Sequence, residues 1–166
     1  MNRHPSTALA AACVALALSG ACAAQAQTLY DSLTERGACF ARDYDAAHLR
    51  AHPDQTVTHF HLGDPGPDWR DAQTQGHYNL AFGFLVVGGD DVYAGIGICE
   101  PRGAMAACDI ESDGGAFTIE PNGSGLRIRL TRMQAEGMSD FSPDLALSDN
   151  RVMLLYPAPS AACAAS

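Results

Sequence analysis

Four histidines at short spacings are the residues in this sequence whose types and positions first point to chemistry. His48 and His52 are four positions apart, so both imidazoles share a face if the segment is helical. His59 and His61 are two apart, so they share one face of a strand. Imidazoles paired in this way can bind Zn²⁺ or Cu²⁺, and the four side chains together predict a candidate metal site. The competing interpretation needs no metal: the first pair packs on a short helix, and the second lies on a solvated strand face.

A polar, Pro/Gly-rich loop at residues 63–76 contains the second candidate. Trp69 lies there among three carboxylates, those of Asp64, Asp68 and Asp71. An aromatic side chain can anchor a partner, and the acidic surroundings favour a cationic one. In the alternative interpretation the tryptophan ring covers the open end of the sheet, and the carboxylates keep the loop solvated.

Sequence signatures of catalysis are absent. Gly123-Ser124-Gly125 lacks the frame of a nucleophile elbow, and the neighbouring Asn-Gly turn accounts for its glycines. The carboxylates are too scattered to single out an acid–base pair. We therefore expect a protein that is not an enzyme, and we expect no cofactor.

The start of the chain has the three parts of a secretory signal. Arg3 supplies the positive charge, residues 8–18 are apolar, and Ala24-Gln25-Ala26 is a cleavage site of the A-x-A type. The signal would occupy residues 1–26, leaving 27–166 as a single domain in the periplasm or outside the cell. A second interpretation is a lipoprotein signal, in which Cys22 would be acylated. No later segment is long and apolar enough to span a membrane.

Four cysteines remain after the signal: Cys39, Cys99, Cys108 and Cys163. An even number in an exported chain predicts two disulfides, with three possible connectivities. A four-cysteine metal site would show paired CxxC spacings, and the sequence has none.

The charge narrows the class of partner. The formal net charge is −9, and all 10 basic side chains are arginine. An acidic chain is a poor ligand for nucleic acid or for anionic membrane surfaces. The negative net charge favours a cationic protein, a small cationic ligand or a metal ion as the partner. It could also serve solubility alone.

The elements that would position these side chains begin with two short helices. Residues 28–36 form a helical lead-in, and residues 46–52 form a helix that Asp45 caps and Pro53 ends. Residues 55–62 then alternate as a strand.

Residues 80–87 and 92–99 predict a hairpin around Gly89-Asp90. A turn centred there places Phe82 opposite Gly97 and Phe84 opposite Gly95. The aromatic rings would then cover the space that the glycines leave empty. Both faces are apolar, so the hairpin is expected to be central and covered on both sides.

Three further strands, at residues 106–111, 116–120 and 126–131, are joined by turns at Asp113-Gly114 and Asn122-Gly123. This register sorts the apolar side chains onto one face and the charged ones onto the other. One set of side chains is expected inside: Cys108, Ile110, Phe117, Ile119, Leu126, Ile128 and Leu130. The other is expected outside: Asp109, Glu111, Thr118, Glu120, Arg127 and Arg129.

The same register predicts the disulfides. Cys99 and Cys108 fall opposite each other on neighbouring strands, within bonding range, which leaves Cys39 to pair with Cys163. With a last strand at residues 151–156, the chain has six or seven strands. It predicts an all-β protein, a small antiparallel sandwich or barrel with one short N-terminal helix.

The stretch from Cys39 to Leu49, followed by His52-Pro53-Asp54-Gln55-Thr56-Val57, resembles a family of small secreted proteobacterial proteins. That family has a cysteine before a Y-x-x-x-H-L-x-x-H-P-x-Q-x-V run, then two nearby cysteines, a DGG turn and a closing cysteine. Asp113-Gly114-Gly115 would be that turn. The resemblance implies export and this architecture, and it implies no particular activity. His59 and His61 are not part of the pattern.

The sequence therefore predicts an exported cell-envelope protein that binds a protein or a small ligand without catalysis. A basic envelope enzyme such as lysozyme is one partner that would suit its charge. The first alternative is periplasmic Zn²⁺ or Cu²⁺ binding through the histidines, and the second is an enzyme of a class that the motifs do not reveal.

Overall fold

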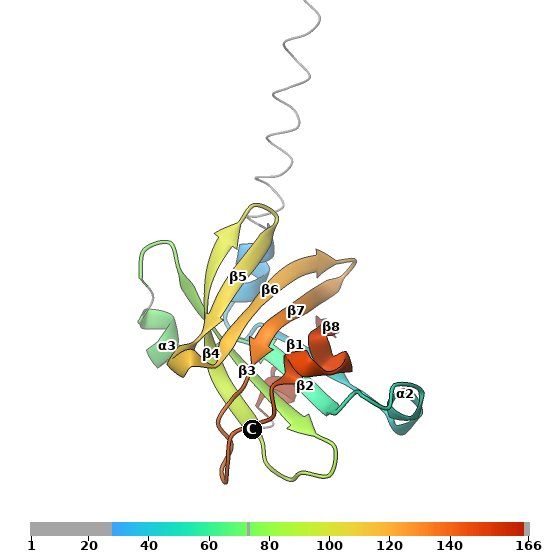
Figure 1. Ribbon diagram of the computed structural model, residues 1–166. Helices are drawn as coiled ribbons and strands as arrows, with labels where there is room; N and C mark the ends of the chain where they lie inside the picture. Colours follow the sequence, from blue (N-terminus) through green and yellow to red (C-terminus); the bar gives the residue numbers. More distant parts are fainter. Residues whose placement is uncertain (1–27, 73, 165–166) are drawn as a thin grey trace, which may run out of the picture.

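The protein is a closed barrel of eight antiparallel strands, seen in a computed structural model that describes residues 28–72 and 74–164 (Figure 1). Each strand pairs with the next along the chain, and the last pairs with the first. The strands are β1 (Cys39–Asp43), β2 (Val57–Gly63), β3 (Tyr78–Val86), β4 (Tyr93–Arg102), β5 (Met105–Ile110), β6 (Gly115–Asn122), β7 (Gly125–Met133) and β8 (Val152–Pro157). The predicted signal peptide and Cys22 lie outside the described residues.

The all-β prediction is confirmed, and of its two architectures the barrel is the one observed. The structure has one strand more than the sequence predicted, and the additional one is β1. Its sequence, CFARD, runs from buried Cys39 and Phe40 to exposed Asp43 without alternating. A strand this short shows no period-2 pattern from which it could be predicted.

Short helices surround the barrel. The predicted lead-in is helical at residues 28–34, where Leu29 and Leu33 are buried and the Tyr30 ring meets the edge of Tyr78. The predicted α2 (Ala46–Ala51) is present, and α3 (Pro67–Asp71) lies in the loop before β3. Four 3-10 turns complete the set: η1 (Glu111–Asp113), η2 (Leu145–Leu147), η3 (Asp149–Arg151) and η4 (Ser160–Cys163). Within the described ranges, no helix has the length and apolar character needed to cross a bilayer.

The interior of the barrel is filled by aromatic side chains. Phe60, Phe82 and Phe84 stack with nearly parallel rings, and Phe117 meets Phe82 edge-on. None of the four is more than 1% exposed. Since this packing occupies the middle of the barrel, the surfaces open to a ligand are the outside of the barrel and its ends.

The β3–β4 register differs by two residues from the predicted one. Phe82 pairs with Gly95, and Phe84 pairs with Tyr93. The loop is longer than a two-residue turn because it extends from Val87 to Val92. A shift of two preserves which side chains face inward, so the packing of aromatic rings on glycine is still found: a Cβ on Gly95 would lie 2.8 Å from Phe82 Cζ.

The prediction that this hairpin is covered on both sides is wrong. Val87 and Ile98, on its outer face, are 56% and 39% exposed. A barrel has one interior, so a strand that packs inward presents its other face to solvent unless a helix or loop covers it.

The inside and outside sets predicted for β5, β6 and β7 are confirmed. Every residue of the inside set is buried, and none of the outside set is. The turns differ slightly from the prediction. Ile110 pairs with Gly115, so four residues including η1 form the first loop, and Gly123-Ser124 rather than Asn122-Gly123 forms the second.

Both predicted disulfides are confirmed. Cys99 and Cys108 are direct cross-strand partners. Cys39 joins Cys163 across a Cα–Cα distance of 5.9 Å. The second disulfide lies beside the seam where β1 meets β8, a seam with only two residue pairs in register, Phe40 with Pro157 and Ala41 with Tyr156. Two disulfides indicate an oxidising compartment outside the cytoplasm.

Candidate functional site

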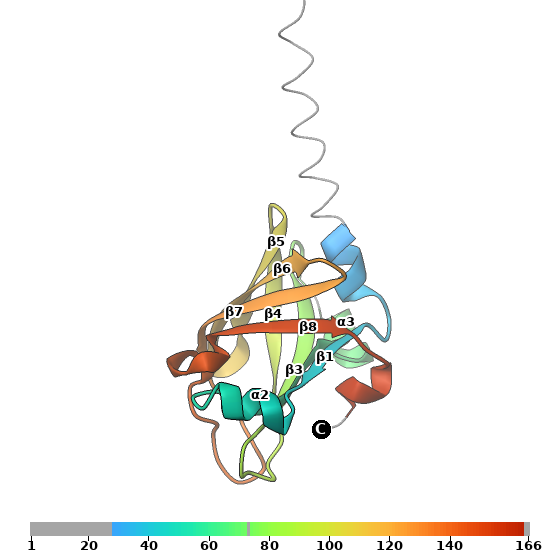
Figure 2. The same ribbon diagram turned by 90° about the vertical axis from the view of Figure 1, so that its right-hand side faces the viewer.

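A groove of about 600 Å³ opens beside the turn between β5 and β6. It lies away from the end of the barrel that the helix at residues 28–34 covers (Figures 1 and 2). One wall is the turn, the other is the segment that follows β7, and the first residues of β4 form the floor. The lining residues are Ala94, Gly95, Ile110, Glu111, Ser112, Asp113, Gly114, Arg132, Gln134, Ala135, Glu136 and Phe141.

The turn wall has an unusual backbone. Ser112 and Asp113 are the only described residues other than glycine with positive φ, 55° and 61°. Left-handed backbone costs a residue with a Cβ about 1 kcal/mol or more, although aspartate tolerates it better than most. Such conformations persist only where the surrounding structure holds them in place, and they gather at functional sites.

The two glycines of the DGG turn allow a close crossing. A Cβ on Gly115, whose φ is 119°, would lie 2.2 Å from the carbonyl oxygen of Arg132. A Cβ on Gly114 would lie 2.7 Å from the carbonyl oxygen of Gln134, whose own N–H donates to the Gly114 carbonyl at 2.8 Å. The glycines therefore let the chain after β7 lie directly against the turn, and this contact joins the two walls.

The groove is negatively charged. Glu111 and Asp113 line the turn wall, and Glu136 lines the other. Arg132 is the one cation among the lining residues, and it is fixed by neighbours: it donates to the Asp113 carbonyl at 3.1 Å and to Oε1 of Gln134 at 2.6 Å. Three carboxylates against one guanidinium leave the lining residues with an excess of negative charge.

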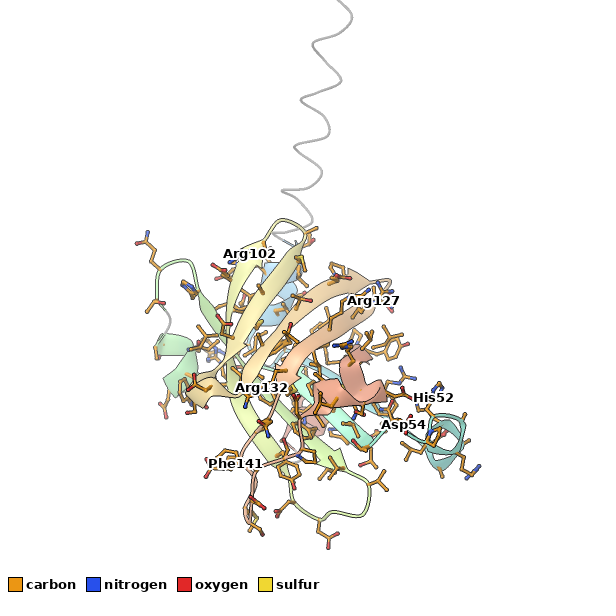
Figure 3. All side chains as sticks on the ribbon, in the orientation of Figure 1. His52, Asp54, Arg102, Arg127, Arg132 and Phe141 are labelled. Carbon is orange, nitrogen blue, oxygen red and sulfur yellow. A yellow bond between two sulfur atoms is a disulfide. The ribbon has the colours of Figure 1, made fainter. Side chains whose placement is uncertain are left out.

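Apolar side chains extend the groove outward. Phe141 is 65% exposed and Met138 92% exposed, both on the loop after β7. Two hydrogen bonds hold this loop in place. The backbone carbonyl of Glu136 accepts from Ala94 N–H, and Ser139 N–H donates to Asp91 Oδ2. Figure 3 shows Phe141 and Arg132 on the same side of the barrel, far from the labelled Arg102 and Arg127.

The predicted partner surface around Trp69 is only partly available. The carboxylate of Asp64 already has partners within the protein. It accepts hydrogen bonds from the N–H groups of Gly37 and Gly66 and forms an ion pair with Arg70. Partial burial acts to raise the pKa of Asp64, but these hydrogen bonds, that from Arg70 above all, outweigh it and the pKa lies below its usual value. Trp69 remains 41% exposed.

The other two predicted contacts, Asp68 and Asp71, are exposed on α3. Neither they nor Trp69 lines the groove. In Figure 1 both α3 and the turn between β5 and β6 lie at the lower left of the barrel, but no residue of α3 is among those that line the groove.

The four histidines form two separate pairs. His48 and His52 stack on α2 with ring centroids 4.5 Å apart, and Asp45 caps that helix as predicted. His59 and His61 lie on the outer face of β2 but are 9% and 3% exposed, so the solvated face expected for them is wrong. The His61 ring lies directly over Gly83, where a Cβ would be 2.5 Å from Cε1. The glycine makes room for the ring.

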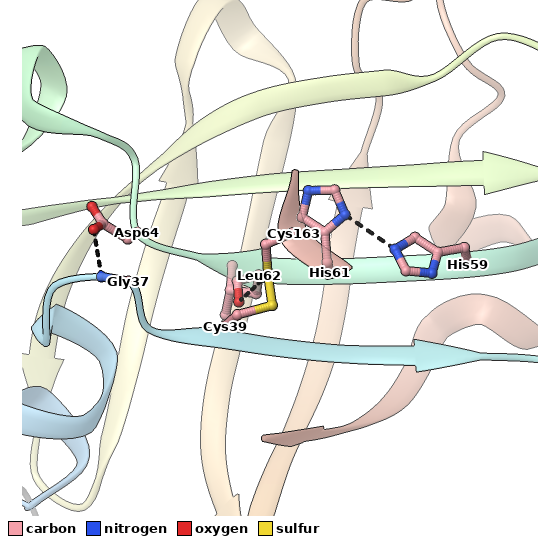
Figure 4. The surroundings of a disulfide bond; sticks show 7 residues. All are labelled: Gly37, Cys39, His59, His61, Leu62, Asp64 and Cys163. Atoms are coloured by element: carbon pink, nitrogen blue, oxygen red, sulfur yellow. Dashed lines mark hydrogen bonds between the residues drawn. A yellow bond between two sulfur atoms is a disulfide. The ribbon is translucent and has the colours of Figure 1, made fainter. Parts of the chain in front are cut away.

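A chain of hydrogen bonds connects the buried pair to solvent. His59 Nδ1 is 2.7 Å from the exposed Asp43 carboxylate. His59 Nε2 is 3.2 Å from His61 Nδ1, the contact that Figure 4 shows. A carboxylate only accepts, so His59 donates from Nδ1; with a neutral His59 ring, Nε2 then accepts from His61 Nδ1. Burial, with a smaller effect of His59, lowers the pKa of His61 to about 4.

Among the described residues, no three or more His, Cys, Asp or Glu side chains are grouped in a way that could hold a metal ion. The prediction that all four histidines form one site is therefore not supported by their positions. Two separate candidates remain, each with two imidazoles: His48 with His52, and His59 with His61.

Sequence reasoning missed the groove. The DGG turn was noticed, but its pattern is explained by a hairpin, and nothing in the sequence places Glu136 or Phe141 next to it. Glu136 meets β4 through a single bridge to Ala94, across 42 positions of the chain. A contact of that range leaves no local signal. Comparison with known proteins adds nothing further, because no protein family, no curated protein and no solved structure matches this chain.

Proposed function

We propose that this protein is an exported, non-enzymatic binding module of the periplasm or cell exterior, and that its groove receives a cationic group of a partner protein or small ligand. The observation that supports this most directly is that Glu111, Asp113 and Glu136 line one groove together with small and apolar residues. Carboxylates at the edge of a low-dielectric surface attract a cation more strongly than they would in water.

Other features agree with binding. The walls are held by backbone hydrogen bonds, so little ordering is needed when a ligand enters. The net charge of −9 would speed the approach of a basic partner.

The test is an NMR titration of the mature, oxidised protein with lysozyme as a basic probe. We expect amide shifts around η1 and residues 132–141, and we expect them to disappear in the double variant Asp113→Asn, Glu136→Gln. Asn is suited to the left-handed backbone at 113, so the turn should survive. Asp68→Asn, which removes a charge from α3, is the matched control and should bind normally. Shifts that vanish with Asp68→Asn instead would place the binding surface at Trp69.

A second candidate is Zn²⁺ or Cu²⁺ binding at His59 and His61. Their facing nitrogens, 3.2 Å apart, are at the spacing of two ligands on one tetrahedral ion, and Asp43 orients the first ring as outer carboxylates do in metal sites. We expect a metal titration to show one site that the variant His59→Ala, His61→Ala loses and the variant His48→Ala, His52→Ala retains. Binding weaker than about 100 μM in the parent protein would dismiss this candidate.

A further inference from the structure

We infer that the group received by the groove is an arginine side chain on an exposed loop of a partner protein. This rests on the proposed function and makes it more specific, because a groove for cations could equally take a lysine, a polyamine or a free ammonium compound. Three features of the groove separate these ligands.

The first feature is the floor. Ala94, Gly95, Ile110 and Ala135 present small or apolar surface below the carboxylates. An arginine side chain has an apolar stem of three methylenes behind its charge, and burying a methylene gains about 0.8 kcal/mol. A small free ammonium compound has no such stem to bury. Lysine has one, so the floor alone does not separate it from arginine, and the next two features do.

The second feature is the placement of the carboxylates on two walls. Glu111 and Asp113 lie on the turn, and Glu136 lies on the facing segment. A guanidinium has five N–H donors in a planar fork, so it can bond to both walls at once. A lysine ammonium is a point charge with a tighter water shell, and it loses more hydration for fewer directed bonds.

The third feature is the exposed ring of Phe141 at the edge of the groove. Guanidinium groups stack on aromatic faces, and a cation over a ring gains about 0.5–1 kcal/mol at an exposed site. The ring therefore adds to the preference for arginine that the carboxylates create.

The surface around the opening indicates a protein loop rather than a free small molecule. Met138 and Phe141 extend beyond the groove, and Val87 is exposed on the β3–β4 loop. The two loops are joined by the Ser139–Asp91 hydrogen bond. Apolar side chains around a polar pocket are typical of protein interfaces, where they shield the central contact from water.

Arg132 restricts how the guest enters. Its guanidinium is held on the turn side by Asp113 and Gln134, so a second cation on that side would be repelled. The groove therefore takes one guest guanidinium, which bonds to the carboxylates of both walls and lies against Phe141.

The experiment compares three peptides that differ in one side chain: Ac-Leu-Arg-Gly-Leu-NH₂, its lysine counterpart, and its citrulline counterpart, which keeps the shape of arginine without the charge. Each is titrated into the oxidised mature protein into the millimolar range, and groove amide shifts give the Kd. We expect the arginine peptide to bind roughly tenfold more tightly than the lysine peptide, the difference that one additional charged hydrogen bond would make. The citrulline peptide should not saturate.

Phe141→Ala supplies a second readout. The substitution should weaken binding of the arginine peptide several-fold and leave binding of the lysine peptide nearly unchanged. The ratio of the two affinities should therefore become smaller. Trp69→Ala is the matched control and should change neither. The side chain of Phe141 is exposed, so its removal leaves no cavity in the core.

The outcomes separate this inference from the proposed function. Equal affinity for the arginine and lysine peptides would overturn the arginine inference and leave a general cation groove. Equal affinity for the citrulline peptide would overturn both. Lysozyme binding at the groove with no measurable binding of any peptide would overturn the single-arginine arrangement alone.

Discussion

At the scale of single residues, a large electrostatic effect falls on a histidine that the groove does not use. His61 is 3% exposed, and its ring packs over Gly83. Its proton lies between two imidazoles, and only His59 has a carboxylate beside it. Protonating His61 would place a cation in a site that offers no counter-charge of its own.

Stability should therefore depend on pH through His61. The folded protein keeps His61 neutral down to about pH 4, whereas the unfolded chain takes up this proton near pH 6.5. The unfolded state binds more protons between these values, so the free energy of unfolding falls as the pH is lowered through this window, by at most about 3 kcal/mol. Urea unfolding with EDTA present measures the slope.

His61→Leu should flatten that slope, and His77→Gln, which removes an exposed histidine, should not. If His61→Leu does not fold, an NMR titration of the His61 ring in the parent protein gives the pKa directly. A value near 6.5 would contradict the prediction.

A second prediction at this scale concerns the wall of the groove. Gly115→Ala should lower the free energy of unfolding by about 2–4 kcal/mol, because it combines a φ of 119° with a methyl group 2.2 Å from the Arg132 oxygen. Gly123→Ala is the matched control: its φ is 62°, but no atom lies within 4 Å, so it should lose only about 1 kcal/mol. Urea unfolding measures both changes. If the two variants lost equal free energy of unfolding, the contact between Gly115 and Arg132 would not be tight.

At the scale of elements, strand pairing was predicted correctly where apolar and polar residues alternate along the chain, and incorrectly where they do not. Phe117, Ile119 and Ile128 alternate with polar residues, so a slip by one position would bury charge, and that part of the register is correct. The β3–β4 hairpin has apolar residues on both faces. A shift of two keeps every side chain on its own face, so the pattern could not exclude it, and the turn chosen from Gly89-Asp90 was wrong.

The groove could not be predicted for a different reason. Its walls come from residues 111–114 and 132–141, and the second wall has no regular period. The DGG turn is visible in the sequence, but the close contact of Arg132 with Gly115 follows from the shift of register between Ala116 and Phe117 in the β6–β7 pair, which the alternating pattern does not reveal. Likewise, burial of His61 requires the gap above Gly83, which no local pattern encodes.

The two disulfides act on different elements, and their removal should differ in cost. Cys99–Cys108 closes a short loop within one hairpin, worth about 2.5–3 kcal/mol, whereas Cys39–Cys163 spans 124 positions and is worth about 5. The second also holds the barrel closed beside the two-pair seam of β1 and β8. We expect Cys39→Ser, Cys163→Ser to unfold at lower urea than Cys99→Ser, Cys108→Ser. The reverse order would mean that the seam holds without its disulfide.

At the scale of the whole molecule, charge should control how fast a partner arrives, and the groove should control how long it stays. The net charge of −9 acts over a Debye length of about 8 Å at 0.15 M salt, so its effect on association is screened as salt rises. Contacts inside a closed interface are screened much less. The two contributions can therefore be separated by kinetics.

Asp113→Asn and Asp68→Asn each remove one negative charge, the first in the groove and the second on α3. For lysozyme binding measured by stopped flow, we expect kon of the parent protein to fall at least tenfold between about 0.01 and 0.15 M salt. Both variants should lower kon slightly and alike, because each changes the long-range field by one charge. Only Asp113→Asn should raise koff, by roughly tenfold, because it removes an acceptor at the site of contact. If Asp68→Asn raised koff and Asp113→Asn did not, the contact would lie at Trp69. If neither changed koff, the acidic surface would attract the partner without holding it.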